Sequence, residues 1–139
     1  MAAAPQGPEG RTVVGRVPTD SALQRKLTYW QRLLRLRDWY VKARWATAHE
    51  ISGKVSQVTT HPVKRNAIIL VGRPDNYEHR DENTEDADWA VLDWEVALVH
   101  ELLHLHFSPF DADDDSPQQV AQEQAIHAIA AALVEANRA

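Results

Sequence analysis

Hydrophobic positions in the first half of the chain predict one helix followed by three strands. Apolar residues first recur at intervals of three and four, at Leu23, Leu27, Trp30 and Leu34. This spacing predicts a helix that begins with Asp20 as its N-cap and ends near Arg37. Three later segments, residues 39–46, 54–60 and 66–71, instead alternate in polarity or are rich in β-branched residues, which predicts strands.

Helical spacing returns twice in the second half. An apolar stripe predicts a helix over residues 85–107, and it consists of Trp89, Leu92, Val96, Val99 and Leu103. Pro109 ends this helix. Ser116 followed by Pro117 is a start signal for a last helix that reaches about Asn137. The order predicts an α+β fold with a small, mostly antiparallel three-stranded sheet and helices packed on one face.

The composition is that of one domain. The chain has 139 residues, 44% of them hydrophobic, and residues 19–139 are expected to form this domain behind a disordered tail of residues 1–18 rich in Ala, Pro and Gly. The tail lacks the apolar core of a signal peptide, and no stretch approaches the ~20 apolar residues of a membrane span. There is no cysteine, which excludes thiolate metal ligands and is compatible with a reducing cytoplasm. We therefore expect a cytoplasmic protein without a membrane segment.

Charge is distributed unevenly along the chain. Thirteen of the 15 Lys and Arg precede residue 74, whereas 16 of the 20 Asp and Glu follow it. The basic half could meet nucleic acid, but solvated faces of a helix and a sheet explain it more simply, so we do not expect nucleic acid as the main partner. The acidic stretch at 75–88 is expected to be a solvated loop, since it lacks the ligand spacing of an EF-hand.

The stretch VHELLHLHF, residues 99–107, places ionisable groups in an otherwise apolar helix. His100 and His104 are four residues apart and so share one face, where two imidazoles can bind one metal ion. Glu101, on the flank, can reach a water at an open coordination position, which is the HExxH arrangement of zinc peptidases. Without a ligand, these groups would cost desolvation energy unless they lay on the solvent side of the helix. His106 points to nearly the opposite side and is expected to be structural.

A third ligand must come from elsewhere in the chain. The metzincin extension of the motif needs glycine and histidine where this chain has Phe107 and Phe110. The last helix offers Glu123 and His127, which are one turn apart. We favour Glu123, because it is nearer the start of its helix and hence nearer His104, whereas His127 is about 6 Å further along. His127 would then support a ligand or contact substrate, and it remains the alternative third ligand.

With LVHELLHLHF and EQAIHAIAAAL, the chain resembles the compact glutamate-zincin metallopeptidases. These include the ImmA/IrrE and SprT-like groups and small metallopeptidase-like proteins encoded by bacteriophages. The resemblance covers residues 20–138 in layout, but the motifs cover only the last two helices. It implies a minimal zincin-like fold and, if a phage encodes the chain, a place in the cytoplasm of the host cell.

The resemblance also implies a site and a reaction. It assigns one Zn²⁺ per chain to His100, His104 and Glu123, and it makes Glu101 the general base of zinc-dependent peptide-bond hydrolysis. The chain departs from the pattern at His127, where glutamate zincins often have an acidic residue. A three-histidine site also occurs in SprT-like proteins.

The substrate expected from the resemblance is a peptide or protein held as an extended strand at the edge of the sheet. We expect the strand NAIILV to be this edge, with substrate-binding groups on Asn66, Ala67, Ile68, Ile69 and Leu70. Candidates for stabilising the oxyanion are His61, Tyr77 and His127.

A competing hypothesis from another class is a non-catalytic regulatory module that keeps the fold and the metal to bind DNA or a protein partner. Glu101 argues against it, because a metal scaffold needs the histidines but has no use for a base beside the water position.

Overall fold

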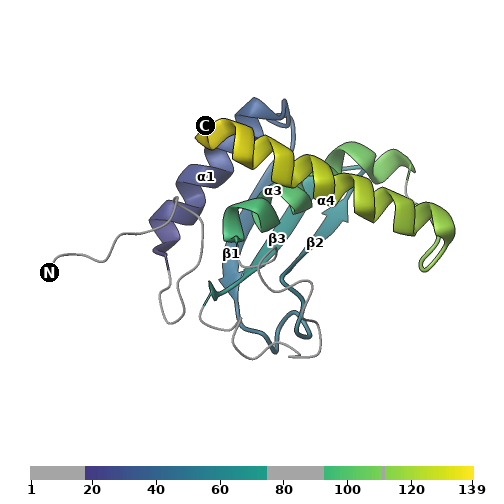
Figure 1. The fold of residues 1–139 in the computed structure, drawn as a ribbon, viewed down its shortest axis with the longest axis horizontal. Helices are drawn as coiled ribbons and strands as arrows, with labels where there is room; N and C mark the ends of the chain where they lie inside the picture. The colour runs from purple at the N-terminus through teal and green to yellow at the C-terminus, as the bar shows by residue number, and fades with distance from the viewer. Residues whose placement is uncertain (1–17, 75–92, 111) are drawn as a thin grey trace, which may run out of the picture.

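The computed structural model describes residues 18–74, 93–110 and 112–139. Its elements, labelled as in Figure 1, are α1 (Asp20–Leu33), β1 (Tyr40–Ala46), β2 (Ser56–His61), β3 (Asn66–Gly72), α3 (Trp94–Phe107), the short 3-10 helix η2 (Ser108–Phe110) and α4 (Pro117–Arg138). This order confirms the predicted α+β class. Residues 1–17 of the predicted tail and all of the predicted acidic loop lie outside the described residues.

Helix α1 differs from its prediction at both ends. Thr19, rather than Asp20, is the N-cap, and its hydroxyl accepts a hydrogen bond from the backbone N–H of Ala22 at 3.0 Å. The predicted end near Arg37 is too late, because Arg35 has a left-handed backbone with φ of 62° and cannot continue a right-handed helix. The helix still buries the predicted apolar stripe against the core.

The sheet is mixed, with the strand order β1-β3-β2. The expected antiparallel pairing joins β2 to β3, while β1 runs parallel to β3. The prediction that NAIILV is an edge strand is wrong, since β3 is paired on both sides and its main chain cannot accept another strand. The physical reason is composition: β3 buries Ala67, Ile69 and Val71, whereas β2 is mostly polar, as edge strands tend to be.

Helix α3 lies between the sheet and α4, which crosses in front of it in Figure 1. It begins at Trp94, because Asp93 has an extended backbone and its side chain accepts hydrogen bonds from the N–H groups of Glu95 and Val96. The predicted start at residue 85 is therefore too early, and Trp89 and Leu92 lie outside the described residues. Because both sides of α3 are covered, ten of its 14 residues are buried.

Helix α4 begins as predicted. The Ser116 hydroxyl accepts a hydrogen bond from the backbone N–H of Gln119 at 3.1 Å, and Pro117 occupies the first turn. Its buried residues are Ile126, Ala130 and Val134, a narrow stripe that packs on α3. Among the helices described, none is long and apolar enough to cross a membrane.

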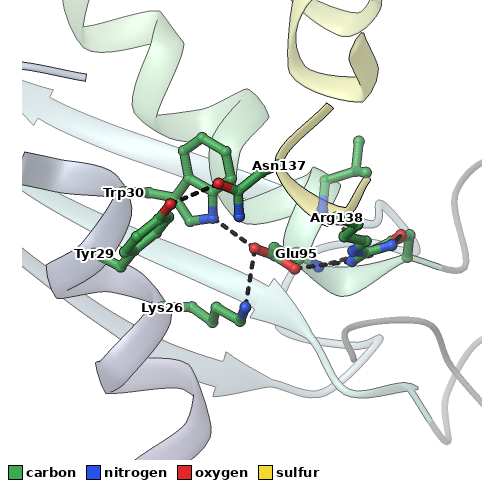
Figure 2. A network of polar contacts seen from close by, with 8 residues as sticks. Lys26, Tyr29, Trp30, Glu95, Asn137 and Arg138 are labelled. Carbon is green, nitrogen blue, oxygen red and sulfur yellow. Dashed lines mark hydrogen bonds and ion pairs between the residues drawn. The ribbon is translucent and has the colours of Figure 1, made fainter. Parts of the chain in front are cut away.

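A buried polar network ties α1, α3 and α4 together (Figure 2). Glu95 on α3 is fully buried and accepts hydrogen bonds from the Trp30 indole at 2.6 Å and from Arg138 at 2.8 Å. Lys26 forms an ion pair with the same carboxylate at 3.3 Å. Arg138 also donates to Asp93, at 2.7 and 3.1 Å. Burial opposes the charge of Arg138, but these two carboxylates outweigh it and raise its pKa.

Candidate metal centre

Helices α3 and α4 bring three potential metal ligands together. One donor atom from each of His100, His104 and Glu123 lies within 4.8 Å of the other two. Glu123 reaches from α4 between the imidazoles, with its Oε1 3.1 Å from Nε2 of His100 and its Oε2 3.0 Å from Nε2 of His104. The imidazole ring centroids are 5.1 Å apart, as expected for two histidines one helical turn apart.

These three residues fit a zinc ion. Zinc takes imidazole nitrogen and carboxylate oxygen at about 2.0–2.1 Å, so neighbouring ligand atoms of a tetrahedral site are about 3.3 Å apart. Each imidazole Nε2 lies 3.0–3.1 Å from a different oxygen of Glu123, which is close to that value, and one donor atom from each of the three residues lies within 4.8 Å of the other two. The two His side chains are 18% and 19% exposed and Glu123 is 43% exposed, so the group is open to solvent on the α4 side.

The surroundings of His100 favour the form that binds metal. Burial lowers the pKa of His100, and the neighbouring His104 lowers it further, while the Glu123 carboxylate opposes both. A lowered pKa keeps the imidazole neutral at physiological pH, and the neutral imidazole is the ligand.

Glu101 is almost entirely buried beside this group, with 6% of its surface exposed. The Ser56 hydroxyl, on β2, donates a hydrogen bond to its Oε2 at 2.6 Å. Burial raises the pKa of Glu101 to about 7, against the opposing effects of Ser56 and Lys54 and with a smaller contribution from the Glu123 charge. A carboxyl that titrates near neutral pH suits general acid–base catalysis.

A cleft of about 590 Å³ opens onto these residues between β2, α3 and α4. Its wall on the sheet side comes from the edge strand and the residues before it, including Lys54, Ser56 and Gln57. On the α4 side it includes Gln122 and His127. The cleft therefore exposes the three potential ligands and Glu101 to one continuous space beside a sheet edge.

The five residues predicted to bind substrate lie outside the cleft. Asn66, Ala67, Ile68, Ile69 and Leu70 are on the central strand, and none of them lines the cleft.

The other histidines differ in their position relative to the cleft. His127 lines the cleft, with its ring centroid 6.0 Å from that of His100, but it does not belong to the three-ligand group. His61, at the far end of β2, is not among the cleft-lining residues, and Tyr77 lies outside the described residues. His106 lies 2.7 Å from the carbonyl oxygen of Leu34.

Two residues with evident roles were not predicted from the sequence. Ser56 is 45 positions from Glu101, and no local pattern links them. Glu95 did leave a signal, because it is a second carboxylate in the apolar run WEVALVHELL and lies outside the HExxH motif.

Comparison of the chain with family models, curated proteins and solved structures gives no match. The interpretation of the site therefore depends on its own residues and geometry.

Proposed function

We propose that this chain is a zinc-dependent metallopeptidase that hydrolyses peptide bonds. His100, His104 and Glu123 are the proposed zinc ligands, and Glu101 is the proposed general base. The observation that carries the proposal is the convergence of two imidazoles and one carboxylate, within 4.8 Å, in a cleft that also contains a buried glutamate one residue from the first ligand.

When bound, zinc would acidify a water molecule and polarise the scissile carbonyl. The Glu101 carboxylate would take a proton from the water and return it to the leaving amine, the double role of one residue in this chemistry. His127 is the oxyanion-stabilising candidate that also lines the cleft.

The proposed substrate is a peptide or protein segment in extended form. Since β3 is central, the strand that could align it is β2, which forms one edge of the described sheet and contributes Gln57, Val58 and Thr60 to the cleft. The absence of cysteine suits a reducing compartment, and we propose the cytoplasm as the place of the reaction.

The test begins with metal content. Protein purified without chelators and supplied with zinc is expected to retain about one equivalent per chain, as the three-residue group implies. Less than a tenth of an equivalent would remove the basis of the proposal.

The second step is hydrolysis of a quenched fluorescent peptide library by the wild type and by Glu101→Gln. This variant keeps the three ligands and is expected to bind zinc normally while losing at least about 10²-fold in rate, because its amide cannot accept the proton. A non-catalytic binding module would show no hydrolysis in the wild type and would keep its binding function in the variant.

A further inference from the structure

Glu101 has one hydrogen-bond partner within the described residues, the hydroxyl of Ser56. The 2.6 Å distance from Oγ to Oε2 is in the range of charge-assisted O–H···O⁻ hydrogen bonds, which are shorter and stronger than neutral ones. The bond occupies one carboxylate oxygen of Glu101. The other oxygen, Oε1, has no partner among the described residues.

The backbone that carries Ser56 is part of the sheet rather than a loop. Ser56 is paired with Val71 of β3, and β2 packs directly on α3. A site built on a strand and a helix holds geometry more closely than one built on loops. The hydroxyl is therefore a fixed point against which the Glu101 carboxylate is oriented.

This orientation matters because the terminal torsion of a glutamate side chain has a broad, roughly two-fold preference rather than sharp wells. The hydrogen bond at Oε2 restricts that torsion and leaves Oε1 in a defined direction. Neither His100 nor His104 helps to orient the Glu101 carboxylate, since the Nε2 of each faces Glu123 on α4.

We propose that Ser56 is a positioning residue for the general base: it holds Oε2 of Glu101 so that Oε1 faces the water that is to be deprotonated. Because Ser56 belongs to β2, the same edge strand fixes both the base and the proposed substrate. This inference rests on the function proposed above.

The experiment compares zinc-loaded wild type with Ser56→Ala and Ser56→Thr. Ser56→Ala is expected to lower kcat by about 10–100-fold, the usual cost of removing a residue that orients an active-site group, with KM unchanged within about twofold. Ser56→Thr, which retains the hydroxyl, is expected to recover most of kcat. Thr59→Val is the matched control, because it removes a hydroxyl from the opposite, exposed face of β2 and outside the cleft, and it should behave as wild type.

A Ser56→Ala kcat within about twofold of wild type would overturn the inference, as would a Ser56→Thr variant no better than Ser56→Ala. Zinc content is expected to match wild type, which checks that Ser56→Ala is metal-loaded. A cooperative urea transition checks that it is folded, with a loss of stability no larger than that of one missing hydrogen bond to a buried carboxylate. An effect on kcat alone would not follow from a merely structural role of the hydroxyl.

A second readout keeps this result separate from the proposed function. Acetohydroxamic acid chelates zinc and has a proton that a carboxylate beside the metal can accept, so its calorimetric Kd for zinc-loaded protein reports the orientation of Glu101 without turnover. Ser56→Ala and Glu101→Gln are both expected to weaken it by about tenfold or more, the cost of a charge-assisted hydrogen bond. No peptide hydrolysis by the wild type would refute the function, whereas an unchanged Kd in Ser56→Ala would refute the role of Ser56.

Discussion

Helix α3 carries two buried glutamates, six residues apart, in opposite electrostatic surroundings. Glu95 is 0% exposed and is contacted by two cationic side chains and an indole N–H. Glu101 is 6% exposed and receives one serine hydroxyl, so burial raises its pKa to about 7. The two carboxylates are alike in sequence context and burial, and they differ in how far their charge is compensated.

This difference is the one expected between a carboxylate with a structural role and one with the proposed catalytic role. Glu95 is surrounded by donors from α1 and α4, and these contacts stabilise the packing of three helices. A buried carboxylate with little compensation, as at Glu101, destabilises the fold, and proteins retain such groups mainly where chemistry requires them. Its position in a cleft next to three potential metal ligands suits the catalytic role proposed for it.

The same substitution at both sites should have opposite effects on stability. Glu95→Gln removes the buried negative charge that Lys26 and Arg138 contact, and it is expected to lower the free energy of unfolding by about 3 kcal/mol. Glu101→Gln removes a poorly compensated charge and is expected to raise it at pH 7. Urea unfolding of the zinc-free proteins measures both. Losses of similar size in the two variants would contradict the distinction between these carboxylates.

The pH dependence of stability also distinguishes Glu101 from Glu95. The folded-state pKa of Glu101 is about 7 and the ordinary value is 4.5, so between these values the folded protein binds more protons than the unfolded chain. The stability contribution of Glu101 is therefore complete below pH 4.5 and falls as pH rises to 7, by about 3 kcal/mol at most. Urea unfolding of zinc-free protein across this window measures it.

Glu101→Gln is the control for this prediction, since it cannot titrate. Subtracting its curve from that of the wild type removes the contributions of His100 and of surface groups, which both proteins share. A difference that is flat from pH 4.5 to 7, or that rises with pH, would contradict the raised pKa.

Zinc affinity should distinguish the two candidate residues on α4. Glu123→Ala removes a group that lies 3.1 and 3.0 Å from the two imidazoles and is expected to weaken zinc binding by more than about 100-fold. His127→Ala is expected to cost no more than about 10–100-fold, as for a supporting residue. Competition with a chromophoric chelator measures both, with the exposed Gln124→Ala as a matched control on the same helix. The reverse ranking would identify a three-histidine site.

Local patterns predicted the elements of the fold but not the arrangement of the strands. Helical spacing located α1, α3 and α4, and Ser116 with Pro117 marked the start of α4 correctly. The position of β3 at the centre of the sheet was missed because strand order depends on which faces are covered, a tertiary property. The contrast between the apolar β3 and the polar β2 was the available signal.

The candidate site shows the same difference between what local sequence patterns predict and what depends on tertiary packing. His100, Glu101 and His104 follow from a four-residue helical repeat, which is local, and Glu123 from its place near the start of α4. Ser56 could not be found in this way, because its hydrogen bond to Glu101 spans 45 residues and depends on how β2 packs against α3.

The smallest expected effect tests whether the two carboxylates are independent. Six residues on a helix span about 9 Å along its axis, a separation at which mutational effects usually add. Glu95 and Glu101 also share no hydrogen-bond or ion-pair partner among the described residues. In a double-mutant cycle of Glu95→Gln and Glu101→Gln, measured by urea unfolding of zinc-free protein at pH 7, the coupling energy is expected to stay below about 0.5 kcal/mol. A coupling above about 1 kcal/mol would mean that α3 links the polar network to the candidate metal centre, so that the two carboxylates belong to one electrostatic system.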